Sequence, residues 1–206
     1  MTDRRRFLAL SAGLAAGLAL PGAARAQAPA AADPRLAERV IGKPEAPVTV
    51  IEYFSLTCGH CAAFHRDTWP RVKSQLVETG RMKMVWRDFP LDQPGLMAAM
   101  VARALPPERY EGFISALFQT QDRWAFGRNV DPRVELARLA ALAGMPREAF
   151  DAALADQALG QGILEQRVRA QQQHNVNSTP TFVFGSRVVP GNMPFYRFAS
   201  LVAETR

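Results

Sequence analysis

Cysteine is scarce in this chain: of its 206 residues only Cys58 and Cys61 are cysteines. A structural disulfide normally closes a long loop, because in the chain-entropy model its stabilisation grows with the number of residues enclosed. The sequence Cys58-Gly59-His60-Cys61 encloses two residues. Covalent haem attachment is excluded, because the Cys-x-x-Cys-His motif requires histidine where Ala62 stands. The pair is therefore better suited to a bond that is opened and reclosed than to a structural cross-link.

Two further features are missing after residue 26. There is no basic run with interleaved aromatic residues, so nucleic-acid binding has little support. There is also no apolar stretch approaching the ~20 residues of a membrane-spanning helix. The first 26 residues hold four of the 25 basic residues and one of the 19 acidic ones, which leaves 21 against 18. The alkaline isoelectric point thus overstates the charge of the remaining chain.

The amino terminus has the three parts of an export signal. Residues 1–6 are basic, residues 7–20 are apolar but too short to span a bilayer, and Ala24-Arg25-Ala26 has the small-x-small form of a cleavage site. Residues 1–26 are therefore predicted to be a signal peptide, and the mature protein to begin near Gln27 in the periplasm. Arg4 to Leu8 is similar to the twin-arginine export motif, which leaves the export route open between that path and the general secretory path.

Export makes a disulfide available, because the compartment outside the cytoplasm is oxidising. Val48 to Phe54 predicts a buried strand interrupted by Glu52, and the apolar residues after Cys61 recur at helical spacing. Cys58 should therefore lie at or just before a helix N-terminus, where unpaired N–H groups and the helix dipole stabilise a thiolate. Pro70 should kink this helix.

His60 lies between the two cysteines. It can add a positive charge or a hydrogen bond to the Cys58 thiolate. Stabilising the thiolate stabilises the reduced form, which makes the corresponding disulfide a stronger oxidant. A histidine at an arbitrary position would more often be an exposed residue of no consequence.

The remaining chain alternates between strand and helix patterns. Residues 82–89 predict a second strand, and residues 94–175 are helical, with Asp131-Pro132 opening one helix and Gly144 following its end. Residues 182–189 predict a hairpin that turns at Gly185-Ser186, and residues 194–203 a final amphipathic helix. The aromatic and methionine side chains of these segments are expected to form core.

Several of these segments together resemble the DsbA family of exported, thioredoxin-like proteins. The resemblance runs from about Ile41 to Val202 and implies an α/β class, thioredoxin-like fold with a helical insertion between its two halves. Residues 27–46 would be a lead-in, and residues 47–206 the thioredoxin-like domain, with the insertion at about 95–160. The matching segments are Gly42 to Val48, Glu52 to Ser55, the cysteine pair, Arg87 to Leu91, Val176 to Phe182, and Val189 to Gly191.

The resemblance also implies roles for three residues outside the cysteine pair. Pro180 would be cis and face the cysteines, and the backbone of Thr179 would pair with extended substrate. Threonine at this position is common in isomerases and reductases, whereas valine is common in oxidases. Glu52 would accept or relay the proton of Cys61. A functional role has physical support, because a carboxylate in an apolar strand is costly unless it is paired or protonated. Its alternative is a partly exposed carboxylate at a strand end.

The sequence therefore favours an exported thiol-disulfide oxidoreductase that donates a Cys58–Cys61 disulfide to reduced proteins. It would act as a monomer, without metal or organic cofactor, and a DsbB-type membrane protein would reoxidise it. A disulfide isomerase or reductase is the alternative that Thr179 favours, although the short lead-in leaves no room for a dimerisation domain. A less favoured alternative is a zinc-binding module that uses the two cysteines and one or two of His60, His65 and His174.

Overall fold

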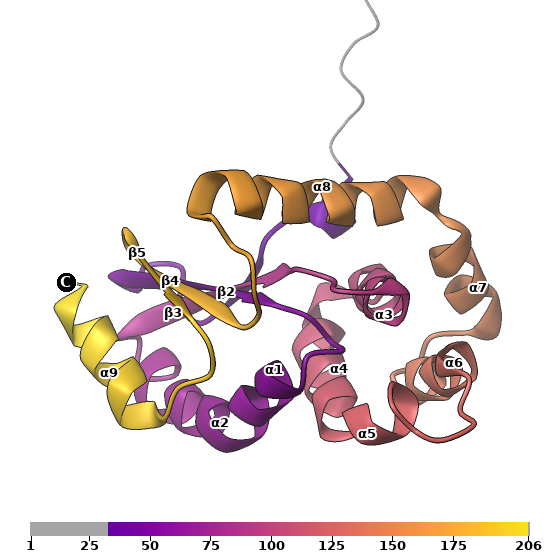
Figure 1. Cartoon of the computed structure of the whole chain (residues 1–206), viewed down its shortest axis with the longest axis horizontal. Coiled ribbons are helices and arrows are strands. Elements are labelled where there is room, and N and C mark those ends of the chain that lie inside the picture. The colour runs from indigo at the N-terminus through magenta and orange to yellow at the C-terminus, as the bar shows by residue number, and fades with distance from the viewer. Residues whose placement is uncertain (1–32, 206) are drawn as a thin grey trace, which may run out of the picture. The chain divides into compact units, whose positions relative to one another are not determined.

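The computed structural model describes residues 33–205 (Figure 1). The predicted signal peptide and residues 27–32 of the lead-in lie outside these residues. Within 33–205, no helix combines the length and the apolar character needed to cross a bilayer.

A mixed sheet of five strands forms the centre of the described body. The strands are β1 (Arg39–Ile41), β2 (Val48–Phe54), β3 (Met82–Asp88), β4 (Thr181–Phe184) and β5 (Arg187–Pro190), in the order β1-β3-β2-β4-β5. Strands β2 and β3 are parallel, and the other three pairs are antiparallel. The two strands and the hairpin predicted from the sequence are confirmed, whereas β1 was not predicted.

Helices cover both faces of this sheet. On one face lie α1 (Gly59–Ala63), α2 (Trp69–Val72) and α9 (Phe195–Glu204), and the long helix α8 (Gln157–His174) runs across the other face (Figure 1). Between β3 and α8 the chain forms α3 (Gln93–Ala104), α4 (Pro107–Gln119), α5 (Gln121–Trp124), α6 (Pro132–Leu142) and α7 (Arg147–Ala155). A 3₁₀ turn, η1 (Pro34–Leu36), precedes β1.

Side chains of β2 alternate between these two faces, as the period of a strand requires. Val50 and Phe54 belong to the main core beneath α1, and Glu52 between them bonds to His65 on that side. Tyr53 belongs to a second, smaller core with Ala170 of α8. Neighbouring residues of one strand therefore enter two different environments.

The helical segment after Cys58 is not a regular α-helix. Two π-helical turns, η2 (Phe64–Thr68) and η3 (Lys73–Val77), flank α2, and the N–H of Trp69 bonds to the carbonyl of Phe64, five residues earlier. Pro70 has no N–H to donate and is the second residue of α2, two positions after the end of the first π turn. The distortion expected from Pro70 thus takes the form of a change in hydrogen-bond register.

The local signals in the helical segment between β3 and α8 are confirmed. Asp131 caps α6, its side chain accepts a hydrogen bond of 2.9 Å from the N–H of Arg133, and Pro132 takes the first helical position. Gly144 follows the end of α6 with φ +79°, a conformation that side chains with a Cβ rarely adopt.

A buried ion pair connects α3 to the sheet and to the lead-in. Arg103 of α3 bonds to Asp88 at the end of β3, and both side chains are nearly inaccessible to solvent. The same guanidinium donates to the carbonyls of Arg35, at 2.8 Å, and Ala37, at 2.9 Å. This pair therefore holds the segment before β1 against the first of the five helices.

Candidate active site

Cys58 is the N-cap residue of α1, as the sequence predicted. Its backbone is extended, and its N–H bonds to the carbonyl of Ser55 at 3.1 Å. Its Sγ accepts a hydrogen bond of 3.3 Å from the N–H of Cys61. A helix that begins here thus directs an unpaired N–H group at the sulfur, which is the arrangement that stabilises an anion.

The two cysteines are free thiols in unequal surroundings. Cys58 keeps 8% of its surface exposed, whereas Cys61 has none. The pKa of Cys58 is lowered to about 5, chiefly by a hydrogen bond from the Cys61 side chain and further by the backbone of Cys61 and His60, against the effect of burial. The pKa of Cys61 is raised well above its usual value by burial, then by Cys58 and the charge of Glu52. The outer sulfur is therefore a thiolate at neutral pH, and the inner one a thiol.

Thr179 and Pro180 lie against the outer sulfur. The peptide bond between them is cis, and both residues are buried. The Thr179 carbonyl oxygen lies 3.2 Å from Cys58 Sγ, which donates to it when protonated and loses this bond on ionising. The N–H of Gly191 bonds to the carbonyl of Pro180 at 2.7 Å, so the end of β5 fixes this segment beside the cysteines.

Glu52 is completely buried on the cysteine side of the sheet. This excludes the alternative of a partly exposed carboxylate at a strand end. Its Oε1 and Oε2 lie 3.0 and 3.2 Å from Nε2 of His65. Its negative charge is also one of the causes that raise the pKa of Cys61.

His65 is a site residue whose role the sequence analysis missed, since it was considered there only as a zinc ligand. It follows Cys61 by four residues, one helical turn, and this spacing alone places both on one helix face. Its ring is surrounded by the aromatic rings of five residues, with Phe118 nearest at 4.2 Å between centroids and Trp86 at 5.0 Å. The other three are Phe54, Phe64 and Trp69.

His60 is exposed beside the active-site cysteines. Its backbone contributes to the low pKa of Cys58. Whether its imidazole adds to this effect in solution stays a prediction.

Polar side chains from outside the motif hold the active-site loop in place. The buried amide of Gln121 in α5 donates to the carbonyls of Leu56, at 2.8 Å, and Cys58, at 3.1 Å. Thr57 bonds to Asp92, at 3.0 Å, and Asp92 also caps α3. The sequence gives no local signal for the contacts of Gln121, because 63 residues separate it from Cys58.

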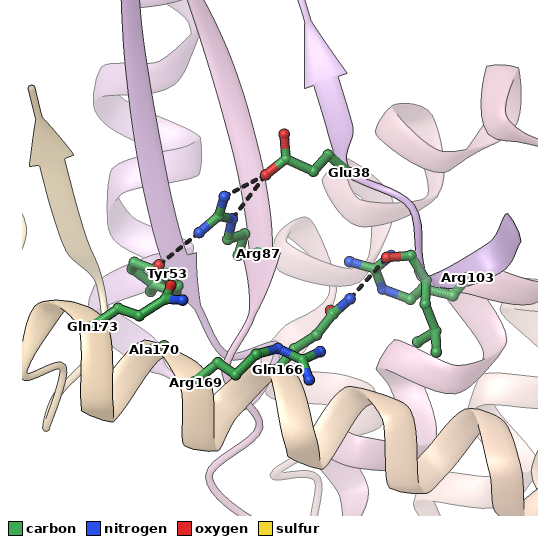
Figure 2. A pocket seen from close by; sticks show the side chains of 9 residues that line it. Glu38, Tyr53, Arg87, Arg103, Gln166, Arg169, Ala170 and Gln173 are labelled. Atoms are coloured by element: carbon green, nitrogen blue, oxygen red, sulfur yellow. Dashed lines mark hydrogen bonds and ion pairs between the residues drawn. The ribbon is translucent and has the colours of Figure 1, made fainter. Parts of the chain in front are cut away.

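A polar cavity of about 250 Å³ lies on the opposite face of the sheet, beside α8 (Figure 2). There Arg87 extends between Tyr53 and Glu38, donates to the Tyr53 hydroxyl at 2.9 Å and pairs with the Glu38 carboxylate. The Tyr53 hydroxyl also bonds to Nδ1 of His174 at 2.8 Å. Because Tyr53 and Glu52 point to opposite faces, this cavity is separated from the cysteines by the sheet.

The three histidines occupy three different environments. His60 is exposed, His65 bonds to Glu52 beneath the cysteines, and His174 bonds to Tyr53 on the other face. Within residues 33–205, no three side chains of histidine, cysteine, aspartate or glutamate are placed to hold a metal ion together.

Comparison with known proteins gives matches over most of the chain. A family profile described as thioredoxin matches residues 35–204. A cysteine-to-alanine variant of α-DsbA1 from Wolbachia pipientis superposes with a TM-score of 0.76 at 30% identity, over 83% of this chain and 94% of that one. Oxidised BdbD from Bacillus subtilis, at 21% identity and TM-score 0.72 over 82% and 92% of the two chains, has the same fold.

A curated protein of Rickettsia felis, provisionally named a protein-disulfide oxidoreductase, is 29% identical over 156 residues. That match covers 75% of this chain and 55% of the relative, so the chain spans about half the length of the curated relatives it matches. Fold, cysteine geometry and these likenesses agree: the chain belongs to the thioredoxin family, and it has the fold of the DsbA proteins.

Proposed function

We propose that this protein oxidises reduced, unfolded exported proteins by transferring the Cys58–Cys61 disulfide to them. The observation that supports this direction is the difference in acidity between the two thiols, with a Cys58 pKa of about 5 and a raised Cys61 pKa. A strongly stabilised thiolate favours the reduced form, and a protein that favours its reduced form gives its disulfide away.

The exchange takes place in two displacement steps. A substrate thiolate attacks Sγ of Cys58, a substrate–Cys58 disulfide forms, and the Cys58–Cys61 bond breaks with its electron pair on Cys61. A second substrate thiolate then attacks the substrate sulfur, and Cys58 leaves as a stable thiolate. The substrate is oxidised by two electrons, and the cysteine pair is reduced by two.

Glu52 serves the first of these steps in our proposal. The departing Cys61 thiolate is buried, and its raised pKa means that it must gain a proton. Glu52 is the carboxyl group whose charge acts on Cys61, so it is placed to supply that proton and to accept it again when Cys61 is reoxidised.

Thr179 and Pro180 would position the substrate. The Thr179 carbonyl faces the attacked sulfur at 3.2 Å, and an extended peptide beside it could pair with this backbone as an added strand. His60, exposed on α1, would add to the stability of the Cys58 thiolate when it is protonated.

Sustained activity needs a protein that reoxidises Cys58 and Cys61, and we assign this role to a DsbB-type membrane partner. The site would be periplasmic, reached through cleavage near Ala26, and the protein monomeric. The helices between β3 and α8 would form an inserted unit of this domain. Mass spectrometry of the N-terminus of protein isolated from the periplasm tests the export step, and an intact Met1 in the cytoplasm would contradict it.

The direction of catalysis is tested by equilibrating the purified protein with glutathione mixtures and measuring the Cys58–Cys61 potential. The oxidised protein should transfer its disulfide rapidly to a reduced, unfolded substrate and should repair a scrambled one poorly. Replacing His60 by Ser should make the disulfide less oxidising.

The same experiment tests a second candidate, a disulfide isomerase or reductase, which is favoured by threonine at position 179. Efficient repair of a scrambled substrate, together with a cysteine pair found reduced in the periplasm, would establish that candidate and rule out the oxidase.

A further inference from the structure

Glu52 has no contact with solvent through which it could exchange a proton. Its exposed fraction is zero, and both of its carboxylate oxygens bond to the same atom, Nε2 of His65. A buried acid that delivers a proton in every catalytic cycle must recover it through a neighbouring group. His65 is the histidine in that position.

The second nitrogen of His65 has no hydrogen-bond partner within residues 33–205. Nδ1 is buried, and the side chain as a whole keeps 2% of its surface exposed. An unpartnered buried nitrogen is costly in a structural histidine, because the group loses its bonds to water and gains none in the protein. A nitrogen that periodically takes up a proton needs to be free of a permanent partner.

His65 also forms part of the wall of a surface cleft of about 210 Å³ between η2–α2 and α4. Phe118 and Trp69 lie beside the imidazole in this wall, and Lys73 and Glu111 form an ion pair of 2.6 Å at the same cleft. The cleft is open to solvent, and His65 belongs to the wall between it and Glu52, with Nδ1 itself covered.

We propose that His65 is a positioning residue that exchanges protons between Glu52 and the solvent in this cleft. The inference rests on the proposed role of Glu52 as the proton donor to Cys61. When the cleft wall moves enough to admit a water to the covered Nδ1, one proton enters there, and the proton on Nε2 passes to the Glu52 carboxylate. Glu52 then protonates the Cys61 thiolate, so one proton is transferred overall and no bond other than those to hydrogen changes.

The other ionisable groups around this pair fit the assignment. Tyr110 of α4 lies near Glu52, and its pKa is raised above its usual range, first by burial and then by Asp88, so it stays neutral. Of the residues at α1, Cys61 faces the Glu52–His65 pair, and Cys58 lies beyond it. On the cleft side the charged groups are Arg66, Lys73 and Glu111, of which Lys73 and Glu111 neutralise each other.

The test compares three single variants: His65→Gln, Glu52→Gln and His174→Gln. In His65→Gln, the glutamine can still donate a hydrogen bond to Glu52 but cannot carry an extra proton. His174→Gln makes the same change at the histidine on the opposite face, bonded to the neighbouring residue of β2, and is the matched control. Each oxidised protein is mixed with a reduced dithiol peptide in a single turnover, followed by the ultraviolet absorbance of thiolates between about pH 5 and 8.

We expect His65→Gln and Glu52→Gln each to slow the reaction at least about a hundredfold, the low end of the usual range for general acid catalysis. The loss should be largest at the acidic end and shrink as pH rises, because a general acid helps only while it is protonated. His174→Gln should react like the wild type at every pH. Alkylation of Cys58 should be unchanged in all three, because it needs only the Cys58 thiolate.

The outcomes separate this inference from the proposed function. If Glu52→Gln is slow and His65→Gln is not, His65 has no such role, whereas the role of Glu52 stands. If neither variant is slow, the role of Glu52 fails and the inference with it. A loss in His65→Gln that is equal at every pH would indicate a structural role and would also overturn the inference.

Thermal unfolding shows whether His65→Gln is folded. Should it not fold, His65→Ala with imidazole added to the solution replaces it. Imidazole that restores the rate supports proton transfer through this position, and imidazole without effect overturns it.

Discussion

Two neighbouring residues of β2, Glu52 and Tyr53, each bond to a histidine, but on opposite faces of the sheet. Glu52 bonds to His65 at 3.0 Å, and Tyr53 bonds to His174 at 2.8 Å. In both cases a side chain of the strand meets a histidine of a helix. The two histidines differ in the side chains that surround them.

On the α8 face the pair belongs to a hydrogen-bond chain beside a polar cavity. Arg87 donates to the Tyr53 hydroxyl (Figure 2). This leaves the hydroxyl proton for Nδ1 of His174. Burial, followed by the charge of Arg87, lowers the pKa of His174, so this histidine stays neutral and accepts. On the α1 face the imidazole is enclosed by aromatic rings and lies one helical turn from Cys61. The alternation of the strand, more than residue type, thus decides which histidine lies beneath the cysteines.

Removing a thiol from the α1 face should have the largest effect. Cys58→Ala and Cys61→Ala should each abolish turnover, but Cys61→Ala should accumulate mixed disulfides with substrates, because the acidic Cys58 remains and nothing resolves them. Non-reducing electrophoresis after acid quenching measures this. The roles would have to be exchanged if alkylation at mildly acidic pH labelled Cys61 of the wild type faster than Cys58.

The pH dependence of stability should be the next largest effect. Cys58 has a folded pKa of about 5 against a usual value of 9.0, so its contribution to the reduced protein is complete above about pH 9 and is lost as pH falls towards 5. The size is roughly 1.4 kcal/mol for each pKa unit crossed. The raised pKa of Cys61 opposes this only in the alkaline range above its usual value.

Denaturant unfolding of the reduced and oxidised forms at several pH values measures this contribution. The reduced form should gain stability relative to the oxidised form between about pH 5 and 8. Cys58→Ser cannot form the disulfide, so its own stability is followed over the same pH range and should show no such gain. A gain that survives this substitution would show that another group titrates.

Replacing Gln121 by Met tests how firmly the active-site loop is held. The carbonyls of Leu56 and Cys58 would lose their buried donor, which should lower the free energy of unfolding by about 1–3 kcal/mol. Urea unfolding gives the value, and the exposed Gln171 of α8, replaced in the same way, should change it by less than about 0.5 kcal/mol. Equal effects of the two substitutions would mean that the amide of Gln121 does not support the loop.

Local sequence signals predicted much of this fold and half of the site. The strand before the cysteines, the helix that begins at Cys58, the cap at Asp131 and the turn at Gly185 depend on residues close in sequence, and all are confirmed. Strand β1 was missed because three residues carry no measurable alternation, and it pairs with β3 more than 40 positions away.

The missed site contacts all join distant segments. Glu52 was singled out because a carboxylate in an apolar strand is costly, but its partner depends on how the helix packs across the sheet. The one-turn spacing from Cys61 to His65 could have indicated that partner. No such spacing links Gln121 to the active-site loop. Its contacts with the loop exist only after the helices between β3 and α8 have packed.

Tyr53→Phe should give the smallest effect and the sharpest comparison of the two faces. It removes one hydroxyl from the α8 face, and with it the hydrogen bonds to His174 and Arg87, while the ring still fills the core beside Ala170. We expect the free energy of unfolding to fall by about 1 kcal/mol, the usual net value of a hydrogen bond. The Cys58–Cys61 potential and the single-turnover rate should be unchanged, because the sheet separates this hydroxyl from the thiols. Tyr196→Phe, at a residue with 77% of its surface exposed, is the control and should alter neither property. A shift of the potential in Tyr53→Phe but not in Tyr196→Phe would show that the two faces of β2 are coupled.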